Sequence, residues 1–160
     1  MRIVHSSLKQ GQGYYTVTMK VASLKSLAPN SSLGGQDLIW MTRWELPTSH
    51  PTLKDQGHVY YAAMESDNGA KPSFYAGQST CGVASDHCKV INYPSTHSVK
   101  GTYAKTGTIT IKAPLADVGK RRTRLDSVTG VTATQTQPAW SGKAIFNVID
   151  STGPYDVTGP

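Results

Sequence analysis

The chain carries little charge and has no long apolar run. Asp, Glu, Lys and Arg make up only 16% of its 160 residues, against about 25% in typical soluble domains. No run approaches the ~18 consecutive apolar residues of a transmembrane helix, so we predict no membrane span. No signal-peptide pattern follows Met1. If the protein is secreted, we expect the chain to be a mature piece or a domain excised from a larger secreted protein.

The chain also lacks recognisable catalytic motifs. It contains no G-x-S-x-G elbow, and its five histidines have neither H-x-H nor H-E-x-x-H spacing. The ten acidic residues fall mostly at turns and strand ends, where Asp is a common turn former. We therefore predict a protein that is not an enzyme and has no organic cofactor. The alternative is a small β-sandwich hydrolase acting on a polysaccharide with two carboxylates facing each other in one cleft.

Cysteine is scarce, and the only two lie close together. Cys81 and Cys88 enclose six residues in the sequence CGVASDHC. So short a loop is easily closed by a disulfide, which would indicate an oxidising compartment. Two alternatives stay open, namely free thiols and a metal site completed by His87. The metal alternative lacks the C-x₂-C spacing of common zinc sites.

Thr, Ser, Gly and Tyr are plentiful, and apolar residues alternate with polar ones in many short segments. Such alternation is typical of strands with one buried face. No segment predicts a helix longer than about a turn and a half. The pattern predicts an all-β, antiparallel β-sandwich of roughly eight to ten strands in a single domain spanning 1–160, with one short helical turn at 114–119. We expect strands at 14–21, 38–46, 59–65, 73–76, 97–103, 108–113, 125–134, 144–150 and 155–158.

The segment 36–77 is expected to form the centre of this sandwich. Both faces of the strand at 38–46 are apolar, so Trp40 and Trp44 are predicted to lie in the core. Asp67, Asn68 and Gly69 should form a hairpin turn, because Asn and Gly adopt the positive φ that tight turns require.

The order of these segments resembles a known kind of domain. The sequences TVTMKVASL, VYYAAME, FYAG, KGTY, TITIKAPLADVG and YDVTG follow one another in the chain. They are similar to β-sandwich accessory domains, Ig- or fibronectin-like in general shape, that are appended to secreted bacterial hydrolases such as subtilisin-like peptidases and sialidases. The resemblance implies a secreted, non-catalytic domain whose partner is the catalytic domain of its parent protein. We expect such a domain to bind carbohydrate, another polymer or the cell surface, or to stabilise its parent hydrolase. It supplies no ligand-binding residues, and the insertion holding Cys81 and Cys88 departs from the pattern.

Carbohydrate or cell-surface polymer is the ligand that the composition favours most. Sugars pack their C–H faces on exposed aromatic rings while polar neighbours fix their orientation. Tyr60, Tyr75, Tyr93 and Trp140 are the candidate ligand-binding residues. The alternative is that these rings are packed in the protein or are singly exposed.

Two charged segments give further candidates. Glu65, Asp67 and Asn68 have the composition of a Ca²⁺-binding loop, although an ordinary turn has the same composition. The run Lys120–Arg124 holds part of the net charge of +6 and is a candidate binding site for anionic polymers; the alternative is a solvated turn between two strands. We do not expect it to bind nucleic acid, because no aromatic residues interleave with it.

Overall fold

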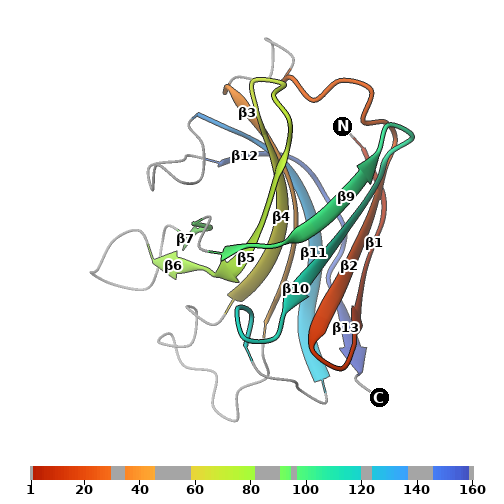
Figure 1. Ribbon diagram of the computed structural model, residues 1–160, viewed down its shortest axis with the longest axis vertical. Helices are drawn as coiled ribbons and strands as arrows, with labels where there is room; N and C mark the ends of the chain where they lie inside the picture. Colours follow the sequence, from red (N-terminus) through yellow and green to blue (C-terminus); the bar gives the residue numbers. More distant parts are fainter. Residues whose placement is uncertain are drawn as a thin grey trace.

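A computed structural model shows two antiparallel β-sheets packed face to face, in agreement with the predicted β-sandwich. The structure describes residues 2–29, 35–45, 59–81, 91–94, 97–119, 124–136 and 146–158. This part of the chain consists of strands, turns and irregular segments, without a helix. Accordingly, it holds no helix long and apolar enough to cross a membrane. Figure 1 views the two sheets from their side, with the smaller sheet at the right.

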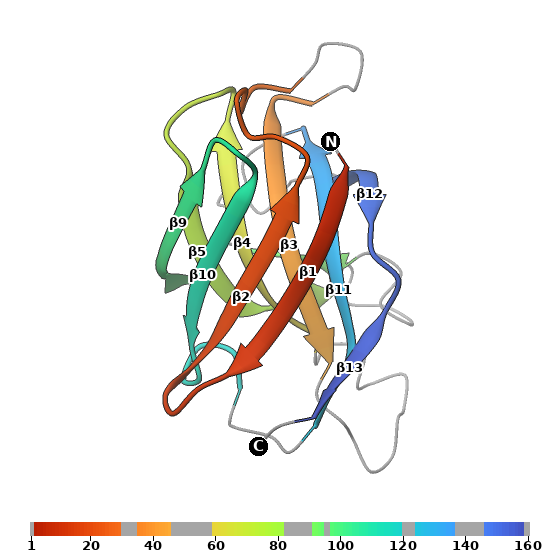
Figure 2. The ribbon, with the colours of Figure 1, turned by 90° about the vertical axis from the view of Figure 1, so that its right-hand side faces the viewer.

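The smaller sheet has four strands and is fully antiparallel. Its spatial order is β1 (Ile3–Gln10), β2 (Tyr14–Val21), β10 (Thr108–Pro114) and β9 (Lys100–Ala104). Figure 2 looks onto the outer face of this sheet. The predicted alternation of the segment 14–21 is confirmed, because Tyr15, Val17, Met19 and Val21 are all buried.

The larger sheet has seven strands and surrounds the central strand that the sequence predicted. Its elements are β12 (Phe146–Ser151), β11 (Arg124–Gln135), β3 (Asp37–Glu45), β4 (Val59–Asp67), β5 (Ser73–Gln78), β8 (His97–Ser98) and β13 (Tyr155–Thr158), the last pairing with β11. A separate two-stranded ladder joins β6 (Thr80–Cys81) to β7 (Ile91–Asn92).

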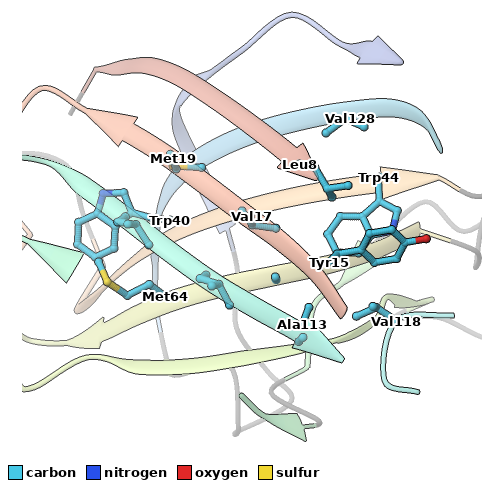
Figure 3. Packing of buried hydrophobic residues seen from close by; sticks show 14 of the residues in the cluster. Leu8, Tyr15, Val17, Met19, Trp40, Trp44, Met64, Ala113, Val118 and Val128 are labelled. Atoms are coloured by element: carbon cyan, nitrogen blue, oxygen red, sulfur yellow. The ribbon is translucent and has the colours of Figure 1, made fainter. Parts of the chain in front are cut away.

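The core between the two sheets is built around two tryptophans. Trp40 and Trp44 are 1% and 0% exposed, which confirms their predicted place in the core. The ring of Tyr15 meets the ring of Trp44 edge-to-face, with 5.6 Å between the ring centroids. Figure 3 shows these aromatic rings at the two ends of a layer of smaller apolar side chains that includes Val17 and Met19.

Of two turns expected from the sequence, the structure confirms one and corrects the other. Asn68 and Gly69 both have positive φ, 47° and 83°, and Ala70 N–H donates to Asp67 C=O at 2.8 Å, so the predicted hairpin turn is confirmed. The segment 114–119, predicted as a short helical turn, forms an ordinary turn. Asp117 N–H donates to Pro114 C=O at 3.0 Å, and no second bond of this kind continues it.

The segment 97–103 was predicted as one strand, and the structure corrects this. It forms two strands in different sheets, β8 in the larger and β9 in the smaller, with Val99 between them. Val99 N–H donates to Phe74 C=O at 3.0 Å. Beyond Val99, a Cβ on Gly101 would lie only 2.1 Å from the Phe74 ring. The chain therefore passes from one sheet to the other at a position where glycine leaves room for an aromatic side chain.

A hydrogen bond between the sheets gives a first prediction. The Tyr155 hydroxyl on β13 donates to the Ser6 carbonyl on β1 at 2.9 Å. We expect Tyr155→Phe to lower the free energy of unfolding by about 1 kcal/mol, because the substitution removes this bond and keeps the ring. Urea denaturation followed by tryptophan fluorescence measures the loss. Tyr103→Phe, at an exposed tyrosine of β9, is the control, and an equal stability of the two variants would contradict the prediction.

Candidate functional site

The outer face of the four-stranded sheet is an open, positively charged surface, which we call the lysine–hydroxyl face. Strand alternation places its side chains away from the core. In chain order they are His5, Ser7, Lys9, Tyr14, Thr16, Thr18, Lys20, Lys100, Thr102, Thr108, Thr110 and Lys112. All of them are exposed or partly exposed, so this face meets the solvent over all four strands of Figure 2.

Strand register arranges these side chains in rows that run across the sheet. One row consists of hydroxyl groups only, from Ser7, Thr18, Thr110 and Thr102. The next row carries three lysines around one threonine, in the order Lys9, Thr16, Lys112 and Lys100. Neighbouring strands are about 4.8 Å apart. The face therefore presents a line of cations beside a line of hydroxyls.

The positive charge of this face is not balanced within the sheet. None of the four strands contains Asp or Glu. Within the described ranges, Lys9, Lys100 and Lys112 take part in no ion pair. Lys20 donates to the Thr106 carbonyl and to the Thr108 hydroxyl, both at 3.2 Å, and these neutral acceptors leave its charge uncompensated.

Tyr14 adds aromatic surface beside the lysine row. The Lys112 ammonium lies 5.0 Å from the centroid of the Tyr14 ring, within the range of a cation–π interaction. The Tyr14 side chain is 39% exposed. This end of the face thus combines a fixed cation with apolar ring surface.

The outer face of the seven-stranded sheet is different, because it is buried and carries a second apolar cluster. Its members are Ile39, Met41, Val59, Tyr61, Ala63, Tyr75, Tyr93, Val131 and Ala133. Tyr61 packs edge-to-face against Tyr75 and Tyr93, at centroid distances of 6.1 and 5.3 Å. Arg43 donates to the Tyr93 hydroxyl at 2.9 Å, and the Tyr61 hydroxyl donates to the Pro94 carbonyl.

A group of polar side chains, which we call the carboxyl cluster, borders this apolar cluster. It consists of Asp37, Glu65, Asp67, Tyr75 and Gln135. Asp37 lies between Asp67 and Gln135 in the strand register. Asp37 and Gln135 are both 0% exposed, and no group of the described residues lies at full hydrogen-bonding geometry to either side chain.

Burial raises the pKa of Asp37 to about 7. The neighbouring Asp67 carboxyl and the charge of Glu65 act in the same direction, and the backbone N–H of Asn68 partly opposes them. Burial also raises the pKa of Tyr75 well above its ordinary value, with a further contribution from the charge of Glu65. Near neutral pH, Asp37 is therefore protonated in part, whereas an ordinary Asp is fully ionised.

The structure brings some of the predicted site residues together and separates others. Tyr75, Tyr93 and Glu65 lie on the buried face of the larger sheet, and Tyr60 is half-buried against the core between the sheets. None of these rings is a flat exposed platform, so their role as ligand-binding residues stays a prediction. Trp140 lies outside the described residues.

The predicted metal-binding and disulfide residues lie in different parts of the chain. Asp67 and Asn68 lie exposed in the β4–β5 turn, whereas Glu65 is buried. Among the described residues no group of three or more His, Cys, Asp and Glu side chains is placed to hold a metal ion. Cys81 ends β6, but Cys88 and His87 lie outside the described residues, and so does the predicted disulfide.

The predicted basic run is described only at its end. Residues 120–123 lie outside the described ranges, and Arg124 forms ion pairs with Asp126 at 2.5 Å and Asp156 at 2.7 Å. The charge of Arg124 is thus already compensated. Sequence reasoning missed the lysine–hydroxyl face, although the alternation within 14–21 and the absence of acids from the four strands both indicated it.

Comparisons with known proteins add no assignment to this site. No family model, no curated protein and no solved structure matches the chain.

Proposed function

We propose that the protein is a non-catalytic β-sandwich module of a secreted protein, and that it binds an extended anionic polymer. The observation that carries this proposal is the lysine–hydroxyl face. Its lysines are exposed or partly exposed and lie on four strands without a single acidic residue. A flat surface with charge of one sign attracts a partner of the opposite sign and holds it through many weak contacts.

The form of the face favours a long ligand over a small one. Small-molecule sites are concave and bury most of their ligand, whereas this face is the open side of a sheet (Figure 2). Its lysines lie on all four strands of that sheet. A polymer with repeated negative charges can contact several of them at once, and so gains affinity from multivalency.

Replacing two lysines of the face tests the proposal. We expect Lys100→Gln/Lys112→Gln to elute from a dextran sulfate column at clearly lower salt than the wild-type protein. Removing two cationic contacts lowers the slope of log K against log salt by about 2. The slope is measured from binding titrations at several salt concentrations.

A second pair of lysines supplies a control with the same change in net charge. Lys25 and Lys71 are exposed and lie outside the face. Lys25→Gln/Lys71→Gln should keep most of the affinity and the wild-type slope. Equal losses in both double variants would show that binding follows net charge and not this face, and the absence of any binding to anionic polymers at low salt would refute the proposed function.

The carboxyl cluster favours a second candidate function, hydrolysis of a polysaccharide. Asp37 and Asp67 lie opposite each other on neighbouring strands, and the raised pKa of Asp37 suits a general acid. Asp37 is fully buried, so binding at the open face is the function that the geometry supports better. Release of reducing ends from a polysaccharide panel by the wild-type protein, abolished in Asp37→Asn, would establish the hydrolase instead.

A further inference from the structure

We infer that the polymer bound by the lysine–hydroxyl face is a carboxylated polysaccharide, lying across the four strands along the lysine row. This inference rests on the proposed function and specifies its ligand. The lysine row provides cations for the carboxylates. The adjacent row of Ser7, Thr18, Thr110 and Thr102 provides hydroxyls for the sugar hydroxyls.

The hydroxyl row favours a sugar polymer over other polyanions. A hydroxyl group both donates and accepts hydrogen bonds, as do the hydroxyls of a sugar. Ser7 makes one long contact, 3.5 Å to the Thr18 carbonyl, and within the described chain the hydroxyls of Thr18, Thr102 and Thr110 have no protein partner. These groups are free to exchange hydrogen bonds with a ligand that lies against the sheet.

Tyr14 supports the same ligand. It lies at the end of β2 beside Lys112, so a sugar unit whose carboxylate meets Lys112 comes close to the exposed part of the ring. Sugar C–H groups pack favourably on aromatic surface. A carboxylate and an apolar sugar face can thus be recognised by two neighbouring side chains.

Nucleic acids fit this face less well. Binding of single strands relies on successive bases stacking on several aromatic rings, and Tyr14 is the one aromatic side chain on the outer face of these strands. Reading a duplex requires an element that enters a groove, and a flat four-stranded face has no such projection.

Binding to polygalacturonate is compared with binding to neutral dextran, polyphosphate and single-stranded DNA. We expect polygalacturonate to bind most tightly and dextran not to bind. Thr18→Val/Thr110→Val removes two hydroxyls and keeps the branched shape of both side chains. It should weaken polygalacturonate binding by about fivefold to tenfold, since each neutral hydrogen bond contributes a factor of a few. It should weaken polyphosphate binding less, because phosphate oxygens accept hydrogen bonds but cannot donate them to the threonines. Tyr14→Ala should also weaken polygalacturonate binding selectively.

The failures of the two proposals are distinguishable. If polyphosphate or DNA binds as tightly as polygalacturonate, and the double threonine variant weakens neither, the face binds polyanions but the polysaccharide inference is wrong. If none of the anionic polymers binds at low salt, the proposed function itself is wrong. Circular dichroism of each variant confirms that the sheets are retained, so that a loss of binding is not a loss of fold.

Discussion

Gly107→Ala is expected to lower the free energy of unfolding by about 3 kcal/mol, one of the two largest effects that we predict. Gly107 has φ of +103°, a conformation that residues with a Cβ rarely adopt. A Cβ at this position would lie 2.0 Å from the Val21 carbonyl oxygen. The obstacle is backbone, so the turn itself must move.

That movement would break one hydrogen bond within the β9–β10 turn and one that connects the turn to β2. Gly107 N–H donates to Ala104 C=O, and Gly107 C=O accepts from Val21 N–H, both at 2.8 Å. The two strands joined by this turn carry Lys100 and Lys112, so we expect the substitution to weaken polymer binding as well. Urea denaturation with tryptophan fluorescence measures the stability.

Gly13→Ala is the matched control. Gly13 has no positive φ, and a Cβ added to it would meet nothing within 4 Å. Its effect should stay within about 0.5 kcal/mol. Equal midpoints for Gly107→Ala and Gly13→Ala would show that the turn tolerates a side chain and that the positive φ is not required.

Much of the fold follows from local patterns in the sequence. Period-2 alternation identified the segment 14–21, and apolar residues on both faces identified the central strand that contains Trp40 and Trp44. These predictions succeeded because successive side chains of a strand point to opposite faces. Burial of one face or of both therefore leaves a pattern of apolar residues that can be read from that segment alone. The break at Val99 could not be predicted in this way, because two short strands in different sheets alternate like one long strand.

The lysine–hydroxyl face was predictable only in part. Alternation within 14–21 already separates Thr16 and Thr18 from the buried side chains. Lys9 comes beside Thr16 through the register of the short β1–β2 hairpin. Lys112 comes beside Thr16 only through the register of β2 and β10, which pairs residues about a hundred positions apart in the chain. Sequence analysis instead identified the run 120–124, because its charges are consecutive in the chain. The lysines of the face are brought together only by strand pairing.

The two outer faces of the sandwich differ in what they contribute to stability, and this difference leaves one of them open for the proposed binding. The outer face of the larger sheet is apolar and buried, so that sheet buries apolar side chains on both of its faces. The smaller sheet buries apolar side chains on its inner face only, and its solvent-facing side carries lysines and hydroxyls. Substitutions on this open face should therefore change binding more than stability.

The carboxyl cluster is expected to make the stability depend strongly on pH. The pKa of Asp37 is raised from 3.8 to about 7 in the folded protein, first by burial and then by Asp67 and Glu65. Between these two pH values the folded state keeps a proton that the unfolded state has released. The free energy of unfolding therefore falls as pH rises, with a contribution from Asp37 on the order of 2–4 kcal/mol, and this contribution becomes constant above about pH 7.

Asp37→Asn isolates this contribution, because asparagine has nearly the same shape and does not ionise. We expect the variant to be close to wild type near pH 4 and more stable than wild type by about 2–4 kcal/mol near pH 8. The measurement is urea denaturation at a series of pH values, and the quantity compared is the difference between the two proteins, so that titration of other groups cancels.

Asp67→Asn separates the two causes of the shift. Removing the Asp67 carboxyl leaves the burial of Asp37 unchanged, so the fall in stability should remain and end at a lower pH than in wild type. If Asp67→Asn removes the fall altogether, the carboxyl pair and not burial dominates the shift. Parallel curves for wild type and Asp37→Asn across this range would show instead that Asp37 ionises in the folded protein as it does in the unfolded chain.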